Sequence, residues 1–286
     1  MTILVTGSTG KLGTIAVKQL MRRVTADQII AGARDVEKAA PLGRLGVRVR
    51  ELDYYKPETF PAAFDKVTRI YLISGNDPNR VQGHKAVIEG AKAAGVKFIA
   101  YTSILHADTA KTVLAKDHLE TEEALKASGL SYTILRNGWY FENYLDNLDT
   151  LLEHGSIFGA TQDAKFSPAR RADYADAAAM VLTNNGHVGK TYELAGDTAY
   201  SLSEIAAEIA RITGKPLKYT DLPVEEYKAL LTRAGLPDFA VNWLSDADLG
   251  VARGELFDES GELKNLVGRP TWTLTRQIED TLKAKK

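Results

Sequence analysis

The sequence predicts a doubly wound α/β fold, in which helices cover both faces of a parallel β-sheet. Short apolar runs alternate with helical patterns about once every 20 to 25 residues in the first half of the chain, as they do in βαβ units. Most of these runs are continuously apolar, which is typical of strands that helices bury on both faces. A glycine-rich turn joins the first run directly to the first helical segment.

The first half contains six predicted strands with amphipathic segments between them. Right-handed crossovers between successive strands place all of them in one parallel sheet. The predicted strands are residues 3–6, 28–33, 47–51, 69–73, 97–102 and 131–136, and the clearest helices are residues 12–22, 81–94 and 115–127.

The pattern changes after residue 154, which predicts a first domain of residues 1–154 and a smaller, mostly helical lobe of residues 155–286. Ser201 and Glu204 form a capping-box signature, and Gly214 suits the end of the same helix. The strand-like pieces are too short for a parallel sheet of their own, although parts of the lobe can return to the main sheet. We expect the lobe to cover the strand ends and to shape a substrate cleft. Its predicted helices are residues 171–182, 202–213, 223–234 and 238–249, and its strands are residues 191–194 and 217–219.

The composition excludes several classes of function. The 286 residues are 44% hydrophobic and carry a formal net charge of −1, so there is no basic field to attract nucleic acid. The chain has no cysteine, which excludes disulfides, thiolate nucleophiles and Cys-ligated zinc or iron–sulfur clusters. The five histidines show no close pairing of the kind that binds metal, so no metal site is expected.

The sequence also argues against a membrane or secreted protein. The first apolar run is too short for the hydrophobic region of a signal peptide, and no Lys or Arg precedes it. No stretch approaches the roughly 20 apolar residues that cross a bilayer. We therefore expect a cytoplasmic protein with no membrane partner.

The turn after the first strand predicts a dinucleotide-binding site in a Rossmann fold. Its glycines have the spacing G-x-x-G-x-x-G, where a strand opens into a helix. One glycine permits the tight turn, one lets the backbone approach a diphosphate, and one allows close packing of the helix on the strand. The N-terminus of the helix presents N–H groups and the positive end of its dipole. The predicted cofactor contacts are Gly7, Ser8, Thr9, Gly10, Lys11, Leu12 and Gly13.

The end of the second strand favours NADPH over NADH. A protein that binds NAD places an acidic residue here for the ribose 2′-OH, whereas Arg34 offers a forked donor that suits a phosphate. Lys11 adds a second positive charge. NADH stays an alternative cofactor, because Asp35 is an acidic residue one position beyond the place where a protein that binds NAD has its acidic residue.

The topology of the sheet predicts further contacts, because ligands of open α/β sheets bind beyond the carboxyl ends of the strands. Asp53 follows the third strand and is expected near the adenine. Ile73, Ser74 and Gly75 end the fourth strand and are expected along the cofactor.

Longer segments make the chain resemble the atypical short-chain dehydrogenases/reductases. With the glycine turn, residues 97–103 and 131–143 resemble the NmrA-like group, and within it the bacterial NAD(P)H:quinone oxidoreductases and the triphenylmethane dye reductases. Residues 170–174 and 192–196 extend the resemblance over nearly the whole chain. It implies that the segment after the sixth strand flanks the nicotinamide end of the cofactor and the mouth of the substrate site. The implied cofactor contacts are Asn137, Gly138, Trp139, Tyr140, Phe141, Glu142 and Arg171.

Three consecutive aromatic residues in this segment are candidates for substrate binding. Trp139, Tyr140 and Phe141 offer flat surfaces on which a planar ring can stack. An amphipathic helix would turn them onto different faces, so at most two of them would line a pocket. Packing in the core is the alternative role.

The resemblance is incomplete at the catalytic residues. Ser103 stands at the position of the family's serine, but Leu114 and His118 stand where its Tyr and Lys belong. Reduction of a ketone makes a strongly basic alkoxide that needs a proton donor, whereas hydride addition to a quinone leads to a phenolate, and phenols ionise near roughly pH 10. Quinone reduction is therefore feasible without the Tyr/Lys pair. Water, His106 or His118 would supply the last proton.

We therefore predict an NADPH-dependent oxidoreductase that reduces quinones or similar planar acceptors by direct hydride transfer, without a flavin or a metal. The alternative from another class is a non-catalytic NmrA-like redox sensor that binds NADP. A cationic dye or an activated alkene as the acceptor, and a homodimer as the assembly, also stay open. A sugar-nucleotide epimerase is disfavoured by the missing Tyr/Lys pair, and a hydrolase by the lack of a G-x-S-x-G elbow.

Overall fold

The computed structural model describes residues 1–285, which divide into two compact units. Unit 1 comprises Met1–Ile104, Asp117–Asn137 and Arg171–Tyr192. Unit 2 comprises Leu105–Lys116, Gly138–Arg170 and the described chain from Glu193 onward.

Unit 1 is built on a seven-stranded sheet. Its strands are β1 (Ile3–Val5), β2 (Ile29–Ala33), β3 (Arg48–Glu51), β4 (Arg69–Leu72), β5 (Phe98–Ile104), β6 (Ser131–Asn137) and β8 (Lys190–Leu194). Their order is β3-β2-β1-β4-β5-β6-β8, and every pair from β3 to β6 is parallel. The order reverses between β1 and β4, and such a switch point is where ligands of open sheets bind. The predicted doubly wound parallel sheet is confirmed.

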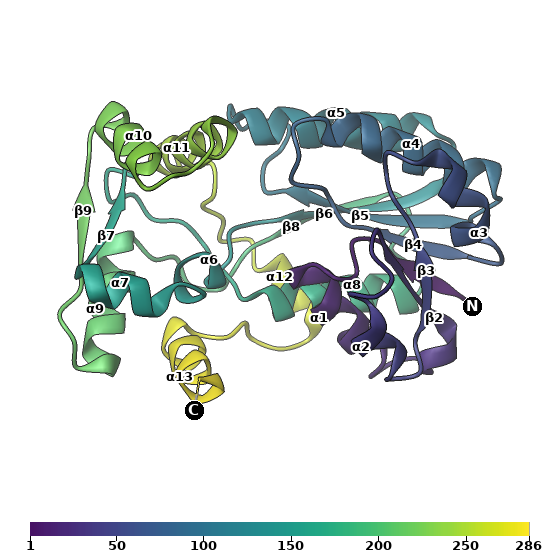
Figure 1. Ribbon diagram of the computed structural model, residues 1–286, viewed down its shortest axis with the longest axis horizontal. Helices are drawn as coiled ribbons and strands as arrows, with labels where there is room; N and C mark the ends of the chain where they lie inside the picture. Colours follow the sequence, from purple (N-terminus) through teal and green to yellow (C-terminus); the bar gives the residue numbers. More distant parts are fainter. Residues whose placement is uncertain (286) are drawn as a thin grey trace. The chain divides into compact units, whose positions relative to one another are not determined.

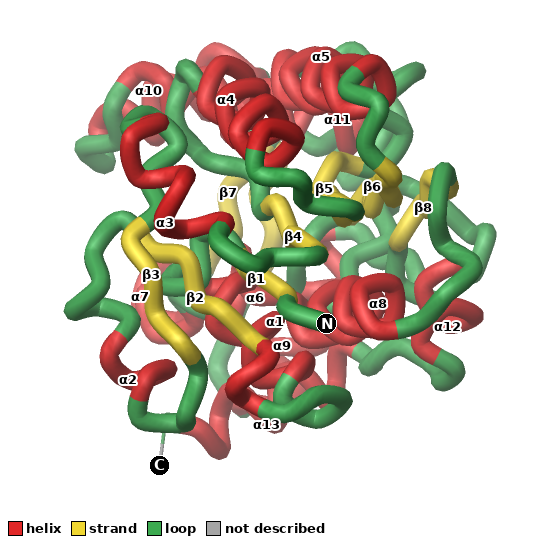
Figure 2. Tube along the Cα trace, turned by 90° about the vertical axis from the view of Figure 1, so that its right-hand side faces the viewer, coloured by secondary structure: helices red, strands yellow, loops and turns green. Residues whose placement is uncertain are grey.

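Helices lie on both faces of this sheet, as the continuously apolar strands predict. They are α1 (Lys11–Leu20), α2 (Ala40–Gly43), α3 (Phe60–Phe64), α4 (Arg80–Ala93), α5 (Val113–Ala127) and α8 (Arg171–Thr183). Helices α3, α4 and α5 cover one face, and α1 and α8 cover the other (Figures 1 and 2). A buried cluster that includes Leu4, Phe64, Ile70, Val87 and Ile99 joins the sheet to the first group. The hydrophobic free energy gained by burying this cluster stabilises the packing of α3, α4 and α5 on the sheet.

The strands of unit 1 and the three clearest helices begin and end within two residues of their predicted bounds. The agreement is close because strands buried on both faces and helices with one apolar face carry strong periodic patterns. The short helices α2 and α3 were not predicted, since four or five residues are too few to show a period.

Unit 2 is mostly helical, with α6 (Glu142–Leu145), α7 (Leu148–His154), α9 (Leu202–Thr213), α10 (Val224–Arg233), α11 (Asp238–Ala252), α12 (Glu262–Val267) and α13 (Leu274–Ala284). The capping box of Ser201 and Glu204 is present at the start of α9, and Gly214 ends that helix with a φ of 69°. The expectation that this region has no parallel sheet of its own is wrong. Strands β7 (Ser156–Gly159) and β9 (Lys218–Asp221) pair in parallel, with Ser156 opposite Lys218. The sequence did not reveal this pair because each strand has only four residues.

The division of the chain also differs from the predicted single boundary between residues 154 and 155. Helix α8 and the start of β8 belong to unit 1, and residues 105–116 and 138–154 belong to unit 2. The reason is topological, since β8 extends the main sheet beside β6 and α8 is the crossover that leads to it. Two discontinuous units therefore replace the two consecutive domains.

Within residues 1–285 the structure contains no helix that combines the length and the apolar character needed to cross a membrane.

Candidate dinucleotide-binding site

The glycine turn between β1 and α1 has the geometry of a diphosphate cradle. Gly7 has a φ of 54°, in the left-handed region that favours glycine. A Cβ atom at Gly13 would lie 2.2 Å from the carbonyl oxygen of Gly7 and 2.8 Å from Cα of Ser8, so only glycine fits there. Gly10 precedes α1 without a side-chain cap, and the first turn of α1 contains no acidic residue. The N-terminus of α1 therefore fits an anion, as the diphosphate of a dinucleotide requires.

The remaining residues of the turn divide into buried and exposed ones. Ser8 is buried, and its hydroxyl donates to the carbonyl oxygen of Gly32 at 3.0 Å. Thr9 and Lys11 are exposed, and Leu12 is half-buried. The hydroxyl of Ser8 thus fastens the turn to β2, whereas Thr9 and Lys11 lie on the surface of unit 1.

The segment 73–75 borders the same turn. A Cβ atom at Gly7 would lie 3.9 Å from Cβ of Ile73, so the ends of β1 and β4 meet as the topology predicts. The segment follows β4 and has no regular secondary structure. Buried side chains take up its backbone N–H groups: Ile73 donates to Oγ1 of Thr6 at 2.9 Å, and Ser74 donates to Oγ1 of Thr102 at 2.7 Å.

Arg34 is exposed directly after β2, at the position predicted for a contact with a 2′-phosphate. Its neighbour Asp35 is engaged differently, because Oδ1 of Asp35 accepts the backbone N–H groups of Glu37 at 3.0 Å and Lys38 at 3.2 Å. One oxygen of Asp35 therefore serves to cap the following turn. This arrangement disfavours Asp35 as the partner of a ribose hydroxyl and strengthens the argument from Arg34.

Asp53 is half-buried after β3. Its Oδ1 accepts the N–H of Tyr55 at 3.0 Å, and its own N–H donates to Oγ1 of Thr59 at 3.3 Å. Tyr54 beside it donates to the carbonyl oxygen of Ile73 at 2.6 Å, which connects the segment after β3 to the segment after β4. The segments after β3 and after β4, both predicted to lie along the cofactor, are thus joined by a direct hydrogen bond.

Comparison with known proteins agrees with this geometry. The sequence profile of an NAD(P)H-binding family matches residues 7–185, a range that begins at the glycine turn. The chain belongs to this NAD(P)H-binding family. Quinone oxidoreductase 2 of Escherichia coli (strain K12) is 47% identical over 96% of this chain and 97% of its own length.

Solved structures of the family have the same fold. The crystal structure of the NADPH-dependent quinone oxidoreductase QOR2 from E. coli, complexed with NADPH, superposes with a TM-score of 0.94 at 46% identity, covering 98% of this chain and 100% of that one. The triphenylmethane reductase of Citrobacter sp. superposes with a TM-score of 0.93 at 34% identity, covering 99% and 100%. The predicted Rossmann fold and the resemblance to these two groups are confirmed.

Ser103, which the resemblance to short-chain dehydrogenases places at the position of their serine, is hydrogen-bonded within unit 1. Ser103 is buried and donates to Oε1 of Glu122 at 2.6 Å. The same carboxylate accepts Nε of Arg136 at 2.9 Å and a terminal guanidinium nitrogen at 2.8 Å. The geometry makes Ser103 part of a buried ion-pair network and does not favour it as a catalytic residue.

The two candidate histidines have contrasting surroundings. His118 is buried, and its Nδ1 lies 2.7 Å from the hydroxyl of Tyr101. Burial lowers the pKa of His118 well below its usual value, so its imidazole is neutral at pH 7 and is not the imidazolium that acts as a general acid. His106, in unit 2, is half-buried, and its Nε2 lies 3.5 Å from Oδ2 of Asp258. Of the two, only His106 has the exposure and the carboxylate partner suited to proton exchange.

The aromatic residues predicted for the substrate are in unit 2, where Trp139 and Tyr140 lie outside any helix and Phe141, with a φ of −54° and a ψ of −37°, is the N-cap of α6. Tyr140 forms a parallel bridge with Ala169, and Phe141 immediately precedes α6. Phe141 is buried, with its ring 5.8 Å from that of Tyr200, so it packs in the core and is not a candidate for substrate binding. Trp139 is largely buried beside Trp243, with ring centroids 6.0 Å apart. Tyr140 is half-buried and is therefore the aromatic residue best placed for a ligand.

The other residues implied by the resemblance fall on both units. Asn137 at the end of β6 and Arg171 at the start of α8 belong to unit 1 and are buried. In unit 2, Gly138 is buried and donates its N–H to the carbonyl oxygen of Leu194 at 2.7 Å, while Glu142 is half-buried.

Four residues of the site were not singled out from the sequence: Thr6, Tyr54, His84 and Thr102. They hold the segment 73–75 by hydrogen bonds from strand ends, a loop and a helix. The only signal of Thr6, Tyr54 and Thr102 in the sequence is their place at or near the carboxyl ends of strands, which many residues share, and His84 on α4 lacks even that signal. The hydrogen-bond partners depend on register and side-chain direction, which the sequence alone does not supply.

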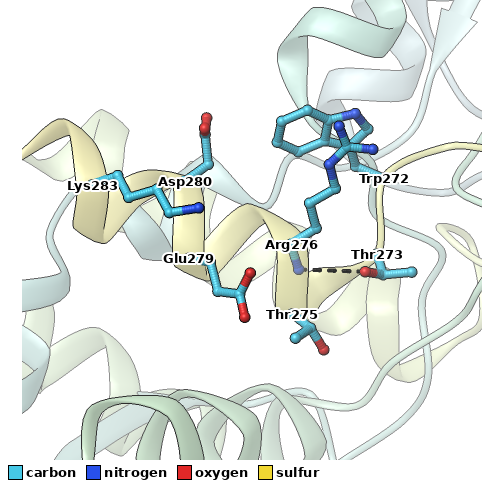
Figure 3. A pocket seen from close by; sticks show the side chains of 7 residues that line it. All are labelled: Trp272, Thr273, Thr275, Arg276, Glu279, Asp280 and Lys283. Atoms are coloured by element: carbon cyan, nitrogen blue, oxygen red, sulfur yellow. Dashed lines mark hydrogen bonds between the residues drawn. The ribbon is translucent and has the colours of Figure 1, made fainter.

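A separate pocket lies along α13 in unit 2 (Figure 3). Guanidinium groups stack on the ring of Trp272, with the Cζ of Arg170 3.3 Å and that of Arg276 3.8 Å from the ring centroid. Acidic and basic side chains both line the pocket, and no residue predicted to bind cofactor or substrate does. Its lining residues are Trp272, Thr273, Thr275, Arg276, Glu279, Asp280 and Lys283.

Proposed function

We propose that the protein is an NADPH-dependent oxidoreductase that reduces quinones or similar planar acceptors, with no flavin or metal required. NADPH supplies a hydride when it is bound. In the net reaction the quinone gains this hydride and one proton to become a hydroquinone, and NADPH becomes NADP⁺. The observation that carries the proposal is the cradle at Gly7 and Gly13, combined with the likeness of the whole chain to quinone oxidoreductase 2 of E. coli.

The preference for NADPH rests on the end of β2. Arg34 is exposed there and can form charged hydrogen bonds with a 2′-phosphate. One carboxylate oxygen of Asp35 is occupied by two backbone N–H groups. Lys11, exposed at the start of α1, adds a second positive charge to the glycine turn. NADH lacks the 2′-phosphate with which Arg34 and Lys11 would interact.

The lack of the usual Tyr and Lys fits a quinone as the acceptor. The product anion is a phenolate, which is far less basic than an alkoxide and needs no strong acid beside it. The role of the protein is then to hold cofactor and acceptor at reacting distance and to exclude water. Tyr140 is the proposed stacking surface for the acceptor, and solvent or His106 the proposed source of the proton.

A non-catalytic sensor of the NADP state is the second candidate. It is favoured by one observation, namely that both Ser103 and His118 are engaged in buried hydrogen bonds. A sensor would bind the cofactor and report its redox state without consuming it.

Turnover by the purified protein tests the proposal. NADPH and NADH are each mixed with a panel of benzoquinones and naphthoquinones, with and without a chelator, and consumption of the reduced cofactor is followed. We expect consumption well above the uncatalysed rate with NADPH, unchanged by the chelator. Tight binding of NADP⁺ without consumption across the panel would instead favour the sensor.

A charge reversal tests the choice of cofactor. Arg34→Asp is expected to weaken NADPH binding more than NADH binding, by about 1–3 kcal/mol, the range expected when a charged hydrogen bond is lost. Lys92→Asp, at an exposed position in the last turn of α4, is the matched control for net charge. Equal weakening of both cofactors by Arg34→Asp would remove Arg34 from the assignment.

The cellular setting is proposed on the same basis. We place the enzyme in the cytoplasm, where NADPH is available, with a small quinone-like molecule as its partner and without nucleic acid or membrane. The assembly stays open, with a homodimer as one candidate, because exposed helices of parallel-sheet folds often associate about a twofold axis. Size-exclusion chromatography with light scattering measures the assembly directly.

A further inference from the structure

Three consecutive backbone N–H groups after β4 are held by side chains instead of by the sheet. Ile73 donates to Thr6, Ser74 donates to Thr102, and Gly75 donates to Nε2 of His84 at 2.9 Å. All three acceptor side chains are buried, and His84 is 0% exposed. Buried N–H groups need partners, so the conformation of this segment depends on these three side chains.

His84 connects the segment to two helices at once. It lies on α4, and its Nδ1 is 3.1 Å from Oγ1 of Thr121 on α5. The hydroxyl of Thr121 in turn donates to the carbonyl oxygen of Asp117 at 3.1 Å. Gly75, α4 and α5 are thereby joined through one imidazole, entirely within unit 1.

These contacts determine the tautomer of His84. The N–H of Gly75 can only donate, so Nε2 must carry a lone pair. The single proton of the Thr121 hydroxyl is directed to Asp117, so this oxygen accepts from His84, and Nδ1 must carry the proton. A neutral imidazole satisfies both bonds. Burial, with the nearby charge of Arg80, lowers the pKa of His84 to about 4 against the smaller opposite effect of Asp77, which agrees with the neutral form.

We infer that His84 is a positioning residue that holds Ser74 and Gly75 in the conformation in which their backbone borders the glycine turn. The inference rests on the proposed function, in which this segment follows the cofactor. A Cβ atom at Gly7 would lie 3.9 Å from Cβ of Ile73, so Ile73 lies beside the glycine turn, and a shift of the next two residues alters the surface that the cofactor meets. His84 does not touch the reacting atoms and acts through the backbone of Gly75.

Two substitutions at His84 separate positioning from general stability. His84→Leu fills the space but cannot accept the N–H of Gly75, whereas Oε1 of a glutamine can. We expect His84→Leu to weaken NADPH binding about tenfold in titration calorimetry, while kcat with a quinone at saturating NADPH stays within about threefold. His84→Gln is expected to recover most of the affinity. The matched control is Thr133→Val, which removes a buried hydrogen bond to the carbonyl oxygen of His187 elsewhere in unit 1 and none to the segment 73–75.

The outcomes distinguish this inference from the proposed function. If the unmodified protein binds NADPH and reduces quinones but His84→Leu retains its affinity, the positioning role is wrong and the function stands. If His84→Gln binds NADPH as weakly as His84→Leu does, or if Thr133→Val weakens NADPH binding equally, the role of His84 is merely structural. If the unmodified protein does not bind NADPH, the proposed function itself fails.

Hydrogen exchange of the unmodified protein provides a test if His84→Leu does not fold. The amide of Gly75 is expected to exchange slowly without cofactor at pH 7, because a buried imidazole holds it. Exchange at the rate of an open loop, becoming slow only when NADP⁺ is added, would overturn the inference.

Discussion

The hydroxyl of Ser103 donates a hydrogen bond of 2.6 Å to Oε1 of Glu122, and both side chains are buried. Glu122 also forms a bidentate ion pair with Arg136, which lies opposite Ser103 in the register of β5 and β6. Two strand ends and α5 are thus held together at Ser103, the position that the resemblance to short-chain dehydrogenases assigns to their serine. Ser103 is the residue type that the resemblance predicts, but its hydrogen bond to Glu122 stabilises the fold.

Ser103→Ala is therefore expected to alter stability more than turnover. Loss of a hydrogen bond to a charged group should lower the free energy of unfolding by about 1.5–3 kcal/mol. Because the hydroxyl is already bound to Glu122, kcat for quinone reduction should stay within about threefold. Urea unfolding and steady-state kinetics measure the two effects. A hundredfold fall in kcat with unchanged stability would return Ser103 to the catalytic site.

Glu122→Gln provides the comparison for the same network. It leaves the buried guanidinium of Arg136 without its counter-charge, which costs about 3–5 kcal/mol when a buried ion pair is broken. We expect a larger loss of unfolding free energy than for Ser103→Ala. Equal losses would show that the ion pair contributes little beyond the serine hydrogen bond.

Gly13→Ala is expected to disrupt the cradle. A Cβ at this position would lie 2.2 Å from the carbonyl oxygen of Gly7, and the backbone must move to relieve the overlap. A loss of about 2–3 kcal/mol in NADPH binding corresponds to a 30- to 150-fold rise in Kd. Gly10→Ala is the graded control, because its Cβ would lie 3.2 Å from the same oxygen. Calorimetry should rank Gly13→Ala well below Gly10→Ala in affinity; the reverse order would contradict the assigned roles.

The sheet and the cradle were predictable because their signals are local. A buried strand shows as an apolar run, and the glycine turn follows directly from the spacing of Gly7, Gly10 and Gly13. The roles of Ser103 and His84 were not predictable, since they depend on partners 19 and 9 residues away in sequence and on the register of strands. The parallel pair β7–β9 was missed for the same reason, because its two strands are far apart in the chain and each is too short to show a period.

The aromatic segment after β6 provides a test of acceptor binding. Tyr140→Ala is expected to raise KM for the quinone about three- to tenfold, the effect of losing roughly 1 kcal/mol of ring stacking. Phe141→Leu is the control, because that ring packs in the core beside Tyr200 and its loss should cost about 1 kcal/mol of stability. Steady-state kinetics at saturating NADPH measures KM. If Phe141→Leu raises KM and Tyr140→Ala does not, the acceptor contacts have been assigned to the wrong ring.

Asp248 on α11 predicts an unusual pH dependence. Its Oδ2 accepts the N–H of Ala160 at 2.8 Å, and burial raises the pKa of Asp248 to about 6 from 3.8, with Asp221 adding to the rise. Between these two values the folded protein binds more protons at this site than the unfolded chain does. The contribution of Asp248 to stability therefore falls as the pH rises from about 4 to 6 and stays low above 6. Two pKa units correspond to about 3 kcal/mol.

Asp248→Asn removes this charge while leaving an oxygen that can accept the N–H of Ala160. We expect the variant to be more stable than the original protein by up to about 3 kcal/mol at pH 8, with the difference shrinking to near zero at pH 4. Urea unfolding at several pH values between 4 and 8 measures it. His84 and His118 act in the opposite direction, because burial lowers their pKa values, so they destabilise the fold as the pH falls below about 6.5. Both histidines are present in the original protein and in Asp248→Asn, so their effects cancel in the difference between the two unfolding free energies. If this difference were constant with pH, Asp248 would not titrate as its burial requires.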